Sequence, residues 1–117
     1  MAAAPSSDTD SAPADSSLAP ELRGKDRRYL RGLGHHLQPV VLLGKHGMTD
    51  GLYAAVDAAL YDHELIKIKR GQECPVDRHE AAAALGGRLG AAVVQKLGQT
   101  VLLYRPHPDK PIITLPR

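Results

Sequence analysis

The chain has 117 residues, of which 43% are hydrophobic and 24% are charged, and it contains one cysteine. This length suits one soluble domain, and no apolar run approaches the roughly 20 residues that a membrane-spanning helix needs. A single cysteine, Cys74, excludes an internal disulfide and a zinc site with several cysteine ligands, which agrees with a reducing compartment. We therefore expect a cytoplasmic protein without a membrane segment.

The first 20 residues differ in composition from the rest of the chain. They are rich in Ala, Pro and Ser, carry three aspartates and contain neither Lys nor Arg, so they lack the basic start of a signal peptide. Such a segment buries too little apolar surface to offset the entropy of ordering. We expect a disordered acidic leader over residues 1–20, most simply a solubilising tail, and one folded domain over residues 21–117.

Charge is informative once the leader is set aside. Residues 21–117 hold all 15 basic residues and 10 of the 13 acidic ones, which gives a net charge of +5. A basic excess attracts polyanions such as nucleic acids, although many ordinary soluble domains share it. The positions of the charges therefore have to indicate the partner.

The first predicted elements are a basic helix and a short strand. Residues 21–37 combine apolar and basic residues at helical spacing and weaken as a helix at the glycines near their end. The exposed face of this helix would present Arg27, Arg28 and Arg31. Residues 39–43, with the sequence PVVLL, are apolar and bounded by polar and glycine residues, which predicts a buried strand.

A tight turn and a second helix follow the first strand. The turn is predicted at residues 44–47, Gly-Lys-His-Gly. Thr49 is a good N-cap, and Asp50 suits the first turn of a helix. The next apolar residues have the spacing of one buried helical face: Leu52, Ala55, Val56, Ala59 and Leu60.

A second strand is predicted over residues 64–70, where apolar and basic side chains alternate. Ile66 and Ile68 would point to one face, while Lys67 and Lys69 would point to the other. The two lysines are therefore candidate contacts for a ligand.

The last part of the chain predicts a third helix over residues 78–89 and a hairpin over residues 92–105, with Gly98 at positive φ in its turn. Residues 112–115 are a candidate for a short final strand. A helix followed by strand, helix, strand, helix and two strands predicts an α/β fold: a two-layer sandwich with a small mixed four-stranded sheet and about three helices.

The turn at residues 44–47 is the main candidate binding site. A strand ends there and a helix begins shortly afterwards, which places free backbone N–H groups and a positive helix end beside Lys45 and His46. Glycines let the backbone approach a sugar-phosphate chain closely, as in the G-x-x-G loop of KH domains. The same spacing also occurs in turns where glycine serves geometry alone, so the motif does not establish a site by itself.

Several motifs in a fixed order strengthen this interpretation. They are the basic opening helix, PVVLLGxxG at residues 39–47, Thr49, HELIKIK at residues 63–69 and GQTVLLYRP at residues 98–106. Together they resemble the YhbY-like single-domain members of the CRM (chloroplast RNA splicing and ribosome maturation) domain family, over about residues 22–117. The acidic leader and residues 71–90 depart from the family pattern.

The resemblance implies a fold similar to the C-terminal domain of bacterial translation initiation factor three. It implies RNA binding through the G-x-x-G loop and the adjoining basic surface, and association of bacterial members with precursors of the large ribosomal subunit. The loop glycines fall on Gly44 and Gly47, and the contact positions between them fall on Lys45 and His46. Family members vary at these two positions, so contacts to specific bases are not implied.

We therefore predict a non-enzymatic RNA-binding protein, a monomer that binds ribosomal RNA in pre-ribosomal particles. Backbone amides of the loop and basic side chains would hold phosphates, while lysines of the second strand and arginines of the opening helix extend a positive track. The predicted RNA-binding residues are Gly44, Lys45, His46, Gly47, Met48, Thr49, Lys67, Lys69, Arg27, Arg28 and Arg31.

Two other functions fit parts of the sequence. The domain could dock a ribosomal or assembly protein through its sheet, or a small phosphate-handling enzyme could use the glycine loop, although no positioned nucleophile or base accompanies it. The histidines and Cys74 lack the spacing of a metal site, so we predict no metal and no cofactor. Tyr104 could stack on a base or serve the core.

Overall fold

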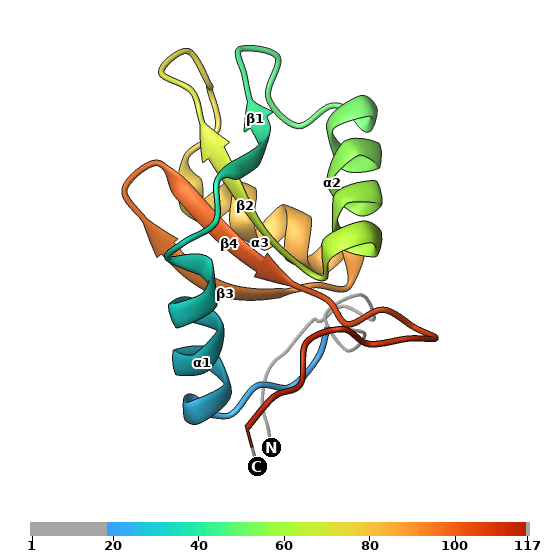
Figure 1. Ribbon diagram of the computed structural model, residues 1–117. Helices are drawn as coiled ribbons and strands as arrows, with labels where there is room; N and C mark the ends of the chain where they lie inside the picture. Colours follow the sequence, from blue (N-terminus) through green and yellow to red (C-terminus); the bar gives the residue numbers. More distant parts are fainter. Residues whose placement is uncertain (1–18, 117) are drawn as a thin grey trace, which may run out of the picture.

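In the computed structural model of the chain, which describes residues 19–116, four strands form one mixed β-sheet (Figure 1). The strands are β1 (Pro39–Leu43), β2 (Leu65–Arg70), β3 (Ala92–Leu97) and β4 (Thr100–Tyr104). Their order is β1-β2-β4-β3, with β1 parallel to β2 and the other neighbours antiparallel. The helices are α1 (Gly24–Gly34), α2 (Asp50–His63) and α3 (Arg78–Leu89). The predicted α/β fold with a four-stranded mixed sheet and three helices is confirmed.

One face of the sheet packs against α2 and α3 and holds the larger core. Ile66 and Ile68 of β2 point to this face, as the alternation in the sequence predicts. On α2, Val56 and Leu60 are buried, Leu52 and Ala59 are half-buried and Ala55 is exposed, so the predicted apolar stripe is the packing face. We call this side of the sheet the first face.

The other side, which we call the second face, is covered by α1 over only part of its area. Leu30 of α1 packs there against Leu65, Leu102 and Tyr104. Gly34, at the end of the helix, lies so close that an added Cβ would come within 2.6 Å of a Leu102 methyl group. The predicted two-layer sandwich therefore describes α2 and α3 with the sheet, and α1 adds a partial third layer.

Local signals fix the ends of the elements. The Thr49 hydroxyl oxygen accepts a hydrogen bond from the Leu52 N–H at 3.1 Å, which confirms the predicted N-cap of α2. The Asp77 carboxylate caps α3 by accepting from the N–H groups of Glu80 and His79, and these bonds lower the pKa of Asp77. Gly98 has φ +59°, as the predicted hairpin requires.

Two predictions from the apolar runs are wrong. The strand at residues 39–43 is not buried: Val40 is 52% exposed and Leu42 is 65% exposed, because β1 lies at the edge of the sheet and α1 covers the opposite end of the second face. Residues 112–115 form no strand. Instead, Ile113 and Leu115 pack against the cluster under α1.

The fully buried Glu64 holds this final segment in place. Its carboxylate accepts hydrogen bonds from the backbone N–H groups of His107 at 2.7 Å, Ile112 at 2.9 Å and Ile113 at 2.7 Å. Burial alone would raise the pKa of Glu64, but these bonds more than compensate, so its pKa is lowered. Glu64 also has φ +65°, a conformation rare outside glycine, at the sharp change of direction from α2 to β2.

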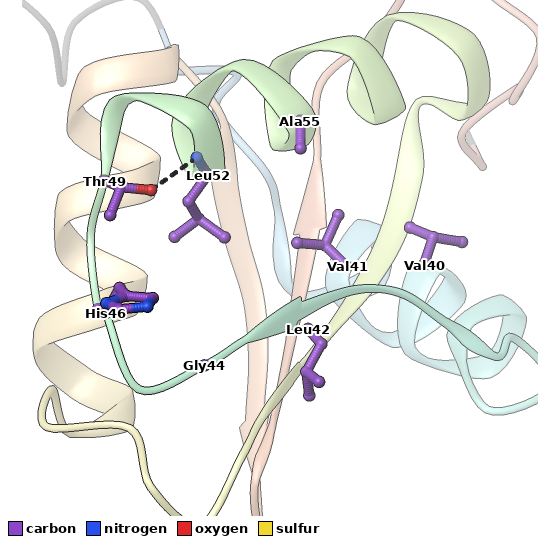
Figure 2. Close-up of a pocket in the computed structure, with 9 residues that line it drawn as sticks. Val40, Val41, Leu42, Gly44, His46, Thr49, Leu52 and Ala55 are labelled. Carbon is purple, nitrogen blue, oxygen red and sulfur yellow. Dashed lines mark hydrogen bonds between the residues drawn. The ribbon is translucent and has the colours of Figure 1, made fainter.

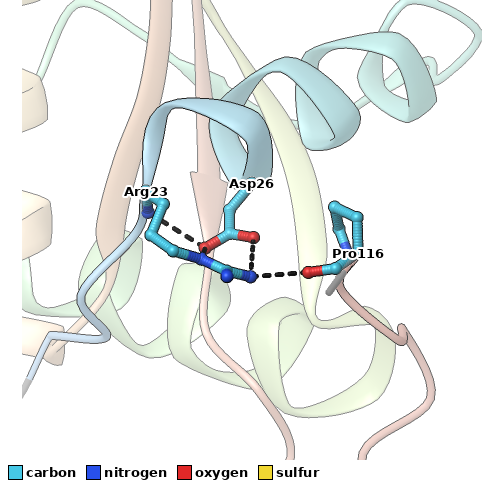
Figure 3. Close-up of polar contacts among 3 residues, drawn as sticks. All are labelled: Arg23, Asp26 and Pro116. Atoms are coloured by element: carbon cyan, nitrogen blue, oxygen red, sulfur yellow. Dashed lines mark hydrogen bonds and ion pairs between the residues drawn. The ribbon is translucent and has the colours of Figure 1, made fainter.

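A second contact ties the final segment to the start of α1 (Figure 3). The Arg23 guanidinium donates two hydrogen bonds to the Asp26 carboxylate, at 2.9 and 3.0 Å, and another to the Pro116 carbonyl oxygen. The bonds from Arg23 lower the pKa of Asp26. Residues near the two ends of the folded domain are therefore joined.

The leader predicted at residues 1–20 lies almost entirely outside the described residues. Across residues 19–116, each of the helices is too short or too polar to cross a bilayer.

Candidate nucleic-acid interface

The predicted loop at residues 44–47 is a closed turn at the end of β1. The Gly47 N–H donates to the Gly44 carbonyl oxygen at 3.1 Å. Gly47 has φ +69°, and an added Cβ would lie 3.3 Å from a Val76 methyl group, so both the backbone conformation and the space favour glycine. Gly44 differs, because nothing lies within 4 Å of the position of its absent Cβ. Gly47 therefore shapes the loop, and Gly44 keeps its outer side open.

The side chains of the loop divide into two groups. Lys45 and His46 are exposed and face solvent. Met48 is half-buried and packs on the first-face core, while the Thr49 oxygen caps α2. Met48 and Thr49 therefore hold the loop in place, and Lys45 and His46 remain available beside the N-terminal end of α2, where the helix dipole favours an anion.

A groove of about 500 Å³ runs beside the loop, between β1 and α2 (Figure 2). Val41 points across this groove toward α2, whereas Leu42 points to the opposite side of β1. Residues of the loop, the strand and the helix line the groove: Val40, Val41, Leu42, Gly44, His46, Gly47, Thr49, Leu52 and Ala55. The groove combines apolar walls with the polar atoms of the loop.

The two lysines of β2 lie on the second face. Lys69 is exposed and is the register partner of Leu42, two residues before Gly44, so the structure brings Lys69 close to the loop. Lys67 is half-buried and pairs with Pro39, farther along the strand. These positions form the first part of the predicted positive track.

The helix α1, which carries the predicted arginines, lies toward the other end of the sheet from the loop (Figure 1). Arg27 is half-buried, and its guanidinium donates to the Val93 carbonyl oxygen at 2.8 Å, so it fastens α1 to β3. Arg28 and Arg31 are exposed. The predicted site therefore has one compact part at the loop and β2, and a separate basic part on α1.

Sequence reasoning missed one charged group beside the loop. The Arg88 guanidinium of α3 lies 4.0 Å from the centre of the Tyr53 ring, and it pairs with Asp50 at 3.3 Å. Asp50 is the first residue of α2, directly after Thr49. No sequence signal links residues 38 positions apart, so this contact depends on the fold.

Other candidate groups have structural positions. Tyr104 is only 3% exposed, so it belongs to the core, and burial raises the pKa of its hydroxyl. Cys74 is buried and its thiol lies 3.3 Å from the Val76 carbonyl oxygen. Within residues 19–116, the His, Cys, Asp and Glu side chains form no group of three suited to a metal ion.

Comparison with known proteins decides the family. Residues 22–105 match the CRS1 / YhbY (CRM) domain model. The chain belongs to this family. The CRM resemblance predicted from the motifs is thus confirmed, and the matched residues include all four strands and all three helices.

Bacterial CRM relatives resemble the chain along nearly their whole length. An RNA-binding protein of Haemophilus influenzae is 41% identical over 82% of this chain and 96% of its own length. YqeI of Bacillus subtilis, named a probable RNA-binding protein, is 37% identical over 81% of this chain and 99% of its own.

A solved structure supports the CRM fold. The solution structure of a hypothetical protein of Staphylococcus aureus, proposed to bind RNA, superposes with a TM-score of 0.70 at 33% identity. It covers 82% of this chain and all of the other one. The described domain is therefore close to the full extent of the Staphylococcus aureus protein.

Proposed function

We propose that this CRM-domain protein binds RNA and holds its phosphates at the loop of residues 44–47. The observation that carries the proposal is the loop itself: Gly47 at φ +69° shapes a turn that leaves Lys45 and His46 exposed beside the first turn of α2. Relatives named as RNA-binding proteins support the same function.

The chemistry of the loop suits a sugar-phosphate backbone. The open side of Gly44 lets a phosphate approach the main chain, and the adjacent helix end and Lys45 add positive charge. Lys69 extends this charge onto the second face of the sheet, and Arg28 and Arg31 extend it onto α1. The proposed contacts are electrostatic and to the backbone, and they involve no catalytic step.

We also propose ribosomal RNA in precursors of the large subunit as the target, bound by a cytoplasmic monomer. The support for this target is the likeness to the YhbY-like single-domain CRM proteins. We expect the protein to bind large-subunit RNA fragments more tightly than small-subunit fragments of equal length at the same salt concentration. Equal binding to both would contradict the assignment of the target, without contradicting RNA binding.

The loop is tested by a variant that changes its charge and keeps its shape. Gly44→Asp fits sterically because nothing lies within 4 Å of its Cβ position, and the new carboxylate would repel a phosphate. We expect affinity for ribosomal RNA fragments to fall by more than about tenfold, since a negative charge is placed where a phosphate approaches the main chain. Lys45→Ala should weaken binding less.

The matched control is Lys110→Ala, which removes an exposed lysine from the final segment. It should bind RNA as the wild type does, and thermal unfolding should show that all three variants remain folded. Unchanged binding by folded Gly44→Asp would refute the loop as the contact.

A further inference from the structure

The half of the second face that α1 leaves uncovered contains a row of four side chains, one from each strand. The strand registers align Leu42 of β1 with Lys69 of β2, Lys69 with Thr100 of β4, and Thr100 with Leu97 of β3. Neighbouring residues in register point to the same face of a sheet. The row therefore crosses the whole sheet, over three strand spacings or roughly 14 Å.

This row is exposed although half of it is apolar. Leu42 is 65% exposed and Leu97 is 64% exposed, and Lys69 between them is exposed as well. Thr100 is half-buried, and its hydroxyl donates a 2.7 Å hydrogen bond to the Leu97 carbonyl oxygen. The two leucines stand at opposite ends of the row, on β1 and β3, with a lysine and a threonine between them.

Charge indicates which partner fits the row. The four strands contain no Asp or Glu, and they contain four basic residues: Lys67, Lys69, Arg70 and Lys96. Arg70 is engaged on the other face, where its guanidinium bonds to carbonyl oxygens of the loop after β2. Lys67 and Lys69 therefore give the uncovered half of the second face a positive charge without a negative neighbour in the sheet.

The row is also continuous with the proposed RNA contact. Leu42 precedes Gly44 by two residues, and its backbone borders the groove beside the loop. At the other side, Gly34 at the end of α1 packs on Leu102, the register partner of Lys67. The row and Lys67 thus lie between the loop and the exposed arginines of α1.

We propose that Leu42, Lys69, Thr100 and Leu97, with Lys67 beside them, bind unpaired nucleotides of the RNA strand that the loop holds. The inference rests on the proposed function and adds a second chemistry to it. The leucines contact the faces of the bases, while the lysines contact phosphates. Apolar contact with the leucines favours a strand that has unpaired bases over one that lacks them. Because leucine side chains form no hydrogen bonds to base edges, this surface discriminates little among the four bases.

The test separates base contacts from phosphate contacts. The probes are a short single-stranded oligoadenylate and an abasic oligonucleotide of the same length, which keeps the phosphates and lacks the bases. The full chain should prefer the base-bearing probe by about five- to tenfold, less than aromatic stacking on several bases would give. A Leu42→Thr/Leu97→Thr double variant should lose most of this preference and bind the abasic probe as before.

Threonine suits exposed strand positions, so the double variant should remain folded, as thermal unfolding would verify. Ile112→Thr is the matched control, because Ile112 is a large apolar residue, 69% exposed, in the final segment. It should keep the preference. Gly44→Asp should weaken binding of both probes, because both have phosphates.

Three outcomes distinguish this inference from the proposed function. A base preference that survives in the double variant overturns the inference but leaves the loop proposal intact. A double variant that binds both probes normally but no longer cosediments with ribosomal particles also overturns it, and assigns the row to a protein. Failure of the wild type to bind either probe or ribosomal RNA refutes the proposed function and the inference with it.

Discussion

The two ends of the sheet use their charged residues in different ways. At the loop end, formed by residues 44–49 and the ends of β1 and β2, Lys45 and Lys69 are exposed and belong to none of the three ion pairs in the described part of the chain. At the anchor end, formed by Glu64, the start of α1 and residues 105–116, four charged side chains bind the chain itself: Arg23, Asp26, Glu64 and Arg105.

The anchor end shows how completely such groups can be engaged. The Arg105 guanidinium bonds to Asp57 at 2.7 Å and to the Leu89 carbonyl oxygen at 3.0 Å, which joins β4 to both α2 and α3. Glu64 accepts from three backbone N–H groups. The comparison suggests a division of roles: substitutions of the bonded charged groups at the anchor end should change stability, and substitutions of the exposed lysines at the loop end should change binding.

Glu64→Gln should give the largest effect. The amide has one acceptor oxygen in place of a charged pair, so at least one of three backbone N–H groups is left without a partner in the interior. We expect the free energy of unfolding in urea to fall by roughly 2 to 4 kcal/mol. Glu73→Gln, at an exposed carboxylate, is the control and should change it little. Equal stability of both variants would contradict the role of Glu64 in holding the final segment.

Acid should act on the same carboxylate with a smaller effect, because a protonated Glu64 keeps both oxygens. Its pKa lies below the usual 4.5, so its stabilising contribution is present above that pH and is lost as the pH falls through the lower pKa. Unfolding measured from neutral pH to acid should therefore show a steeper loss in the wild type than in Glu64→Gln. Parallel curves would show that other carboxyl groups, such as Asp26 and Asp77, dominate.

Alanine substitutions at the two loop glycines should differ in their effect on stability, because Gly47 sets the conformation of the loop and Gly44 only leaves its outer side open. Gly47→Ala places a side chain at φ +69° and 3.3 Å from Val76, which should cost roughly 1 to 2 kcal/mol of unfolding free energy. Gly44→Ala meets no atom within 4 Å and should stay within about 0.5 kcal/mol of the wild type. If the two variants are equally stable in urea, the loop is less rigid than its turn indicates.

Lys69→Ala should have the smallest effect, and only on binding. Loss of one phosphate contact should lower affinity for ribosomal RNA fragments by roughly three- to tenfold and reduce the slope of log affinity against log salt by about 0.7 to 0.9. Arg27→Ala is the informative comparison, because its guanidinium is bonded to Val93. It should lower stability more than affinity; the reverse result would break the division between the two ends.

Local patterns in the sequence predicted most of the fold. The bounds of β1 and α3 agree with the predicted ranges, and Thr49 and Gly98 act as predicted, because helical spacing, caps and turn residues depend on neighbours in the chain. The prediction that β1 is buried was wrong, because burial does not depend on neighbours in the chain alone. An apolar run does not tell whether its strand will lie at the centre or the edge of a sheet.

The candidate site was predicted as a set of residue types, and the structure divides that set. Arg27 looks like Arg28 in the sequence, but it bonds to a carbonyl 66 residues away. The row from Leu42 to Leu97 requires the register of four strands, and the contacts of Glu64 cross 43 to 49 residues. Such relations are set by tertiary structure, so no local pattern could predict them.

The hydrogen bond between Arg23 and Pro116 has a practical consequence for handling this domain. It places the segment before α1 beside the last described residues, on the side of the domain away from the loop (Figure 1). A purification tag, a fluorescent reporter or a surface tether joined directly to the described domain, next to Arg23 or Pro116, would therefore begin on the side away from the loop.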